Sequence, residues 1–283
     1  MKLRQTFKSF ALKTFPQRLL KALKLYHYRR VLKALTDASE LDFKVVKTLV
    51  APGDSVVDIG ANIGVYTKYL SDLLGNQGRV YSIEPVPLTF DILKTNVLHL
   101  ALDNVELLQV AISNENGIAS MEIPTYESGG ENFYMARITL SNETHSMRRL
   151  SVPTRTLDSL LELPTQISFI KCDVEGHEYK CLQGAKRILE TSRPALLIEI
   201  SGIPDEDQSL AQKTFSLLSQ FGYHSFWFDG SSLKPRRVGD RSINYFFLTM
   251  RHLLALHERG FLIQTDPPNS HVRGHSLGPH DPR

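Results

Sequence analysis

Cysteine is scarce in this sequence, because among 283 residues only Cys172 and Cys181 occur. Two cysteines are too few for a disulfide framework or for a zinc site built from cysteines. The sequence also lacks any run approaching the roughly 18 uninterrupted apolar residues that a membrane-spanning helix needs. With 42% hydrophobic residues, the composition is that of a globular protein and excludes collagen-like, coiled-coil and globally disordered chains. We therefore expect a folded protein of a reducing, cytoplasmic compartment.

Acidic residues are missing from residues 1–36, which contain ten lysines and arginines. The rest of the chain holds 23 basic residues and all 30 acidic residues, so the net charge of +3 combines a basic arm with an acidic body. Because an acidic surface repels phosphates, we expect no nucleic-acid partner.

The basic arm has apolar residues at helical spacing on both sides of Pro16, which predicts an amphipathic helix. Such a helix can lie on an anionic membrane, here at the inner membrane surface. The alternative is an arm that packs on the domain or on a second subunit, with its charges in water. The sequence leaves both interpretations open, and it does not give the oligomeric state.

Beyond the arm, short apolar runs alternate with amphipathic stretches. Strands are predicted at 55–59, 79–83, 105–110, 167–172 and 195–200, and helices at 41–49, 65–74, 89–100 and 178–190. This alternation is typical of a parallel sheet with helices on both faces. Two further strands, at 223–228 and 244–250, have no helix between them and are expected as antiparallel neighbours at one edge.

The least regular part of the chain is 113–155, where weak strand patterns at 118–123 and 151–154 flank a long polar stretch. A loop of this length in a compact domain is typically functional or disordered, and we interpret it as a lid that recognises the acceptor. Residues 264–283 are polar and rich in proline, which predicts a disordered tail. The domain itself is therefore expected over 37–263.

One segment combines a predicted strand, a glycine-rich turn and a helix start: SVVDIGANIGVYTKYL. Asp58 ends the strand, and Gly60, Asn62 and Gly64 form the turn, which lets a ligand approach the backbone closely. Glu84 ends the next strand, 20 residues after Gly64, where a carboxylate can accept hydrogen bonds from both hydroxyls of a ribose. The spacing predicts a nucleoside site; the alternative is a purely structural turn.

The charge of this turn indicates which nucleoside it binds. Asp58 points into the turn, and no lysine or arginine occurs between residues 55 and 67. A carboxylate there would repel the pyrophosphate of a dinucleotide, whereas it suits a ligand that carries an ammonium and a sulfonium. S-adenosyl-L-methionine is that ligand.

The sequence resembles the FkbM family of S-adenosylmethionine-dependent methyltransferases. The resemblance is carried by VVDIGANIGVYTKYL, SIEPVPLTFDILKTNV, ISFIKCDVEGHEYKCLQGAKRIL and RPALLIEI. It implies an α/β Rossmann-like methyltransferase fold with a seven-stranded, mostly parallel sheet, an antiparallel edge strand and helices on both faces. It also implies methyl transfer to a hydroxyl oxygen, commonly of a sugar or secondary metabolite.

The same resemblance implies roles for individual residues. The methionine end of the cofactor would be held by Asp58, Gly60, Asn62 and Gly64. Glu84 would hold the ribose, and Ala111 would border the adenine. Cys172 departs from the family, which usually has a bulkier aliphatic residue at this position.

The segment CDVEGHE follows the predicted strand 167–172 and supplies three candidate catalytic groups. Asp173 is expected to face the cofactor or the acceptor, His177 is the candidate general base, and Glu175 is its rival. Such a cluster could also hold Mg²⁺, but neighbouring residues on a turn point in different directions, so no metal site is assigned. Glu178 can simply begin a helix. Glu199, at the end of a later strand, is a candidate for binding acceptor hydroxyls or a structural carboxylate.

Together these features predict an S-adenosylmethionine-dependent O-methyltransferase whose acceptor is a sugar, glycolipid or secondary metabolite with a free hydroxyl. Two alternatives from other classes remain open. One is a catalytically silent cofactor-binding or scaffold protein on the same fold. The other is a nucleotide-dependent oxidoreductase, which the acidic turn disfavours.

Overall fold

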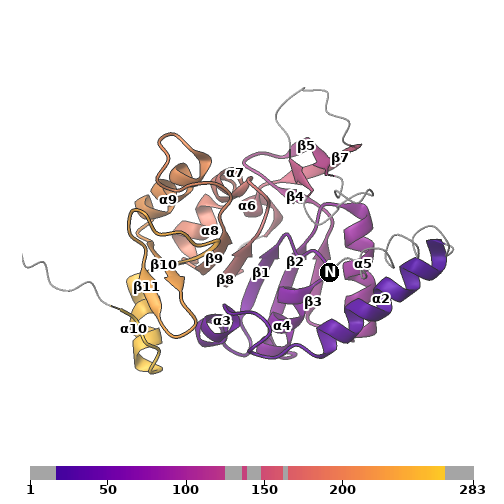
Figure 1. The fold of residues 1–283 in the computed structure, drawn as a ribbon, viewed down its shortest axis with the longest axis horizontal. Helices are drawn as coiled ribbons and strands as arrows, with labels where there is room; N and C mark the ends of the chain where they lie inside the picture. Colours follow the sequence, from indigo (N-terminus) through magenta and orange to yellow (C-terminus); the bar gives the residue numbers. More distant parts are fainter. Residues whose placement is uncertain (1–16, 125–135, 139–147, 162–164, 265–283) are drawn as a thin grey trace, which may run out of the picture.

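The structure is a computed structural model that describes residues 17–124, 136–138, 148–161 and 165–264 (Figure 1). Its main sheet has eight strands in the order β11-β10-β12-β9-β8-β1-β2-β3. The strands are β1 Ser55–Ile59, β2 Arg79–Ile83, β3 Val105–Leu108, β8 Ile167–Cys172, β9 Ala195–Glu199, β10 His224–Phe228, β11 Leu233–Pro235 and β12 Asn244–Leu248. The five strands from β3 to β9 are parallel, and β12 is antiparallel to both β9 and β10.

The α/β class and the mostly parallel sheet are confirmed, but the strand count differs from the seven predicted. The additional strand is β11, a three-residue segment that pairs antiparallel with β10 and forms the edge of the sheet. It ends in Pro235 and is too short to give a periodic pattern. The predicted antiparallel pair is present as β10 and β12, with β12 lying inside the sheet, between β9 and β10.

Helices cover both faces of the main sheet, because successive strand residues point to opposite sides and both sides are apolar. Val56 belongs to the core beneath α3, α4 and α10, and Val57 to the core beneath α6, α7, α8 and α9. The bounds of these helices are α3 Phe43–Leu49, α4 Val65–Leu74, α6 Leu157–Leu160, α7 Glu178–Gln183, α8 Lys186–Thr191, α9 Leu210–Gln220 and α10 Met250–Glu258.

The single helix predicted over 178–190 is wrong, since α7 and α8 are two short helices separated at Gly184 and Ala185. A Cβ at Gly184 would lie 2.0 Å from the carbonyl oxygen of Ser113. The backbone at Gly184 therefore packs directly on the segment that follows β4. This contact joins parts of the chain about 70 residues apart, so the local sequence pattern does not reveal it.

A second sheet has four strands in the order β4-β7-β5-β6, and three of them, β5, β6 and β7, lie in the region 113–155 that the sequence marks as irregular. Its strands are β4 Ala111–Ile112, β5 Gly117–Ile123, β6 Arg137–Ile138 and β7 Arg148–Arg155. The two weak strand patterns are thus confirmed, as β5 and β7, which pair antiparallel along their length. Most of the polar stretch between them lies outside the described residues, so the predicted lid stays a hypothesis.

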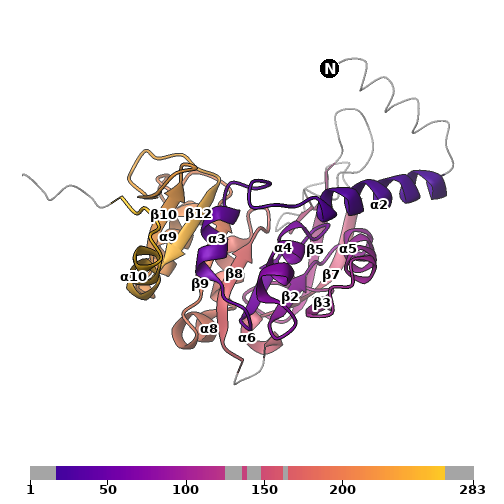
Figure 2. The same ribbon diagram turned by 90° about the horizontal axis from the view of Figure 1, so that it is seen from below.

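The second half of the basic arm is the helix α2 Gln17–Lys33, which contacts α5 Pro87–His99. Figures 1 and 2 both show the two helices side by side. Leu32 is only 1% exposed, whereas Leu23 and Tyr26 are 53% and 61% exposed. One face of α2 therefore packs on the domain and the opposite face is bare.

Residues 1–16 of the arm and 265–283 of the predicted tail lie outside the described residues. In the described part of the chain, no helix is both long and apolar enough to cross a membrane.

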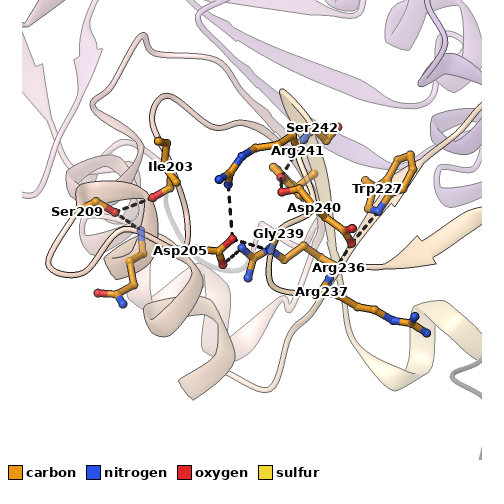
Figure 3. A network of polar contacts seen from close by, with 12 residues as sticks. Ile203, Asp205, Ser209, Trp227, Arg236, Arg237, Gly239, Asp240, Arg241 and Ser242 are labelled. Carbon is orange, nitrogen blue, oxygen red and sulfur yellow. Dashed lines mark hydrogen bonds and ion pairs between the residues drawn. The ribbon is translucent and has the colours of Figure 1, made fainter.

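Asp205 connects two loops, the one that follows β9 and the one that precedes β12 (Figure 3). The carboxylate of Asp205 accepts hydrogen bonds from the backbone N–H of Gly239, at 2.9 Å, and from the Arg236 guanidinium, and it pairs with Arg241 at 3.5 Å. This network fixes the segment after β9 against the segment that leads into β12. Both of those strands carry residues of the site described next.

Candidate active site

The glycine-rich turn lies where β1 ends and α4 begins, as predicted. The backbone φ angles of Gly60, Asn62 and Gly64 are +79°, +51° and +97°, in the left-handed region that glycine adopts without strain. A Cβ at Gly60 would lie 1.8 Å from the carbonyl oxygen of Asp173. Only a glycine fits here, because the turn presses directly against the end of β8.

Glu84, at the end of β2, closes over this turn. Its carboxylate accepts hydrogen bonds from the backbone N–H groups of Asn62, at 3.0 Å, and Val86, at 2.9 Å. Burial raises the pKa of Glu84 to about 7, although the two hydrogen bonds lower it. Each carboxylate oxygen has a second lone pair, so Glu84 can still accept hydrogen bonds from a ligand.

Asp58 is the buried carboxylate below the turn, with 2% of the residue exposed. It accepts a hydrogen bond of 2.6 Å from the hydroxyl of Thr67. Desolvation raises the pKa of Asp58 to about 6. A cationic group of a ligand beside it would restore the ionised form.

Two cavities meet at the turn. The first lies between the glycine turn, the end of β2, the second sheet and the CDVEGHE segment. The predicted site residues that line it are Gly60, Asn62, Glu84, Ala111, Asp173, Glu175 and His177. The second lies on the α4 side and is lined by residues that include Asp58, Gly60, Asn62, Lys171, Asp173 and Glu199. Gly60, Asn62 and Asp173 border both cavities. The predicted cofactor residues are thus brought together, except that Gly64 lines neither cavity and supports the turn from behind, against Leu93.

Asp173 is the point where the two cavities join. Its backbone N–H donates to the carbonyl oxygen of Ile59 at 3.0 Å, which extends the pairing of β8 with β1. Its carboxylate lies 3.7 Å from the ammonium of Lys171. Among the three candidate catalytic residues, Asp173 alone lines both cavities.

Glu175 and His177 face the first cavity only. His177 is 7% exposed, and its Nε2 lies 3.0 Å from the hydroxyl of Ser113. Burial lowers the pKa of His177 to about 4, so the ring is neutral at physiological pH. This position places the predicted base on the Glu84 and Ala111 side, away from Lys171 and Glu199.

Glu178 serves the turn itself, because its carboxylate accepts a 2.7 Å hydrogen bond from the N–H of Gly176. Glu199 ends β9 and faces the second cavity beside Asp173. Desolvation, followed by the charge of Asp173, raises the pKa of Glu199 to about 7. In the described part of the chain, no three histidine, cysteine, aspartate or glutamate side chains are placed to hold a metal ion.

Lys171 is the functional candidate that the sequence reasoning missed. It lies within β8, is 2% exposed, and its ammonium has no hydrogen-bond partner among the described residues. It stands over the ring of Tyr66, 5.2 Å from the centroid. A charged residue inside a mostly apolar strand was the available signal, since lysine is almost never fully buried unless it is paired.

The first cavity and the turn fit the nucleoside ligand that the motif predicts. The side-chain oxygen of Asn62 is buried without a partner among the described residues, and the backbone of Gly60 borders the cavity. Glu84 lines the same cavity and its carboxylate oxygens keep free lone pairs for a ligand. Apolar side chains of the second sheet, including those of Met121 and Ile138, close the far wall.

These features define an α/β protein with a Rossmann-like methyltransferase fold. A sequence model described as the Methyltransferase FkbM domain matches residues 58–225, more than half of the chain. The chain belongs to the FkbM methyltransferase family, which confirms the resemblance seen in its motifs. In a comparison with curated proteins, no match is found.

Solved structures of low similarity include a methyltransferase FkbM from Methylobacillus flagellatus KT. The alignment has 16% identity and a TM-score of 0.47, and it covers 81% of this chain. The chain spans 60% of the length of that protein. A candidate rRNA methylase from Clostridium thermocellum aligns at 14% identity and a TM-score of 0.45, over 72% of this chain and 89% of that one. Fibrillarin from Aeropyrum pernix, with natively bound S-adenosyl-L-methionine, aligns at 14% identity and a TM-score of 0.43, over 72% of each chain. At these values the similarity carries no conclusion about cofactor or substrate.

Proposed function

We propose that the protein transfers a methyl group from S-adenosyl-L-methionine to a hydroxyl oxygen of a sugar, glycolipid or secondary metabolite. One observation carries this proposal. The acidic glycine turn lies at the junction of two cavities, one suited to the adenosine of a cofactor and the other to its methionine end and an acceptor.

In this proposal the carboxylates of the turn select the cofactor. Asp58 faces the second cavity below the turn and complements the positive methionine end. Glu84 accepts hydrogen bonds from the ribose hydroxyls. Ala111 and the second sheet border the adenine, whose flat apolar faces suit the wall that Met121 and Ile138 form. Gly60 and Asn62, which border both cavities, hold the cofactor where adenosine and methionine meet.

The cofactor supplies a methyl carbon activated by the adjacent sulfonium. The residues of the chain align the acceptor with that carbon and remove the proton of the acceptor hydroxyl. Asp173 is the group best placed to take this proton, because it borders both cavities. His177 and Glu175 remain rival bases, and their position in the first cavity favours contacts with the adenosine.

The arrangement also bears on the two alternatives. An oxidoreductase that binds a dinucleotide needs a turn that accepts pyrophosphate, and the buried Asp58 disfavours that ligand. A silent scaffold protein would need no second cavity, yet this one is lined by several titratable side chains. Binding and activity assays separate these cases directly.

The bare face of α2 supports a proposal about location. Leu23 and Tyr26 are exposed on this face, and Arg30 and Lys33 follow at helical spacing. We propose that this face contacts an anionic membrane from the cytoplasmic side. The same helix contributes Tyr28 to the second cavity, so membrane contact would place that cavity near a membrane-bound acceptor.

The proposed function is tested by calorimetric titration of the purified protein with S-adenosylhomocysteine, with wild type beside Glu84→Ala. We expect micromolar binding by the wild type and at least tenfold weaker binding by the variant. Transfer of a labelled methyl group to hydroxylated acceptors then tests the reaction. A folded wild type that binds NADH but not S-adenosylhomocysteine would favour the oxidoreductase, and one that binds neither would favour the scaffold protein.

A further inference from the structure

Besides Asn62, which borders both cavities, two residues of the second cavity have a buried polar atom without a hydrogen-bond partner among the described residues. The ammonium of Lys171 has three N–H donors and no hydrogen-bond acceptor in the described part of the chain. Its nearest carboxylate, on Asp173, is 3.7 Å away, outside hydrogen-bond range. The side-chain oxygen of Asn244 is likewise buried without a donor among the described residues, while its amide nitrogen donates to Asp42 at 2.7 Å. Buried polar groups normally have partners, so this pair indicates that a ligand supplies them.

The charges of the lining limit what that ligand can be. Glu40, Asp58, Asp173 and Glu199 line the cavity with carboxylates, and Lys171 is the single cation among the described lining residues. A phosphorylated or carboxylated acceptor would meet repulsion from several sides. Neutral hydroxyl groups do not, because each can donate to a carboxylate and accept from Lys171.

The walls of this cavity come from distant parts of the chain. Lys171 and Asp173 lie within residues 58–225, the part that matches the family. Tyr28 and Glu40 precede that part and Asn244 follows it. Tyr28 comes from α2, and Tyr66 from α4 presents a second ring to the same space. Aromatic rings beside carboxylates and a buried donor are suited to the apolar faces and hydroxyl edges of a sugar ring.

Building on the proposed function, we infer that the second cavity holds the acceptor beside the methionine end of the cofactor at Asp58, and that it selects an uncharged, polyhydroxylated acceptor. Lys171 donates a hydrogen bond to an acceptor oxygen next to the one that reacts. Tyr28, Glu40 and Asn244 supply specificity from segments outside the family-matching part. When the methyl group is transferred, the acceptor oxygen forms a bond to the methyl carbon as the carbon–sulfur bond breaks. The electron pair goes to sulfur, and the hydroxyl proton passes to Asp173.

The inference is tested with labelled methyl donor and a panel of neutral methyl glycosides, each paired with its uronic acid or sugar phosphate. Wild type is compared with Lys171→Met, Glu40→Gln and the control Lys186→Met, which removes an exposed lysine of α8. Binding of S-adenosylhomocysteine is measured for each protein by calorimetry. Binding of the glycosides to the S-adenosylhomocysteine complex is measured by saturation-transfer NMR.

We expect the wild type to bind and methylate neutral glycosides in preference to their charged partners. Lys171→Met should raise the KM for the glycoside at least tenfold, while S-adenosylhomocysteine affinity stays within threefold and Lys186→Met behaves as wild type. Glu40 is exposed, so Glu40→Gln should fold normally and change the ranking of glycosides. If Lys171→Met does not fold, the comparison of Glu40→Gln with wild type decides the inference, and an unchanged ranking of glycosides would then contradict it.

Three results would overturn the inference: preference for the charged acceptors, equal loss of cofactor and acceptor binding in Lys171→Met, or no binding of any glycoside by a wild type that binds S-adenosylhomocysteine. Failure of the proposed function looks different, because the wild type then does not bind S-adenosylhomocysteine at all.

Discussion

The carbonyl oxygen of Asp173 lies 1.8 Å from the position that a Cβ at Gly60 would occupy. The glycine turn after β1 and the acidic segment after β8 therefore pack backbone against backbone. A second link is the 3.0 Å hydrogen bond from the N–H of Asp173 to the carbonyl oxygen of Ile59. The proposed cofactor turn and the proposed base are thus parts of one rigid unit.

This contact predicts that Gly60→Ala destabilises the protein and abolishes cofactor binding. The new methyl group must displace Asp173, and a left-handed φ of +79° adds strain of order 1–3 kcal/mol. We expect a lower midpoint of urea unfolding and at least a hundredfold loss of S-adenosylhomocysteine affinity by calorimetry.

Gly75→Ala is the matched control, because Gly75 also has a positive φ, +63°, but a Cβ there meets nothing within 4 Å. It should lower stability through backbone strain alone and leave affinity unchanged. Equal affinity losses in the two variants would show that strain, and not the contact with Asp173, explains the result.

Glu84 predicts how cofactor affinity depends on pH. Burial raises its pKa from an ordinary 4.5 to about 7, so the free protein carries a protonated Glu84 below neutrality. The ribose hydroxyls bind best to the ionised carboxylate, so binding at low pH must first remove this proton. S-adenosylhomocysteine affinity should accordingly fall about tenfold between pH 8 and pH 6, since the ionised fraction falls by about that factor.

Glu84→Gln should bind more weakly at pH 8 and lose most of this pH dependence. Glu178→Gln is a suitable control, because burial also raises the pKa of Glu178 to about 7 although its side chain lines neither cavity. It should keep the wild-type pH profile. An unchanged profile in Glu84→Gln would exclude Glu84 as the group that senses pH and leave Asp58 as its source.

The bare face of α2 predicts binding to anionic membranes. Arg30→Glu changes the charge of this face by two units, and each basic residue near an anionic surface contributes about 1 kcal/mol. We expect at least fivefold weaker co-sedimentation with phosphatidylglycerol vesicles and no binding of either protein to phosphatidylcholine vesicles. Lys186→Glu makes the same charge change on α8, which Figure 2 shows on the opposite side of the molecule from α2. Equal losses in both variants would mean that net charge, and not α2, determines binding.

Local patterns were sufficient to predict the parts of the fold whose signals are local. The strand Ser55–Ile59 and the helix Val65–Leu74 have the predicted bounds, because glycines and a proline frame apolar runs. Glu84 was found by its spacing from the turn, since a strand and a short loop fix that distance. The split between α7 and α8 was not found, because a tertiary contact of Gly184 causes it.

The cofactor side of the site was predictable for the same reason, whereas the acceptor side was not. The cavity proposed for the acceptor is lined by Tyr28, Lys171 and Asn244. More than 140 residues separate Tyr28 from Lys171 and more than 70 separate Lys171 from Asn244, and the three residues follow no shared motif. Sequence reasoning also looked for polar residues at strand ends, and Lys171 lies inside a strand. The position of His177 likewise depends on how the turn at Glu175 and Gly176, with φ of +50° and +97°, directs the chain afterwards.

The rival assignments of the base make opposite predictions for two variants. If Asp173 takes the proton, Asp173→Asn should lower kcat at least a hundredfold, the usual worth of a general base, with S-adenosylhomocysteine affinity little changed. His177→Gln should mainly weaken S-adenosylhomocysteine binding, because His177 lines the first cavity beside Ala111. Burial lowers the pKa of His177 to about 4, so its loss should not alter the pH–rate profile between pH 6 and pH 9.

Single-turnover methyl transfer, measured beside calorimetry for both variants, checks these expectations. A large loss of kcat in His177→Gln at unchanged affinity would instead assign the base to His177, and the acceptor hydroxyl would then have to reach the first cavity past Asp173.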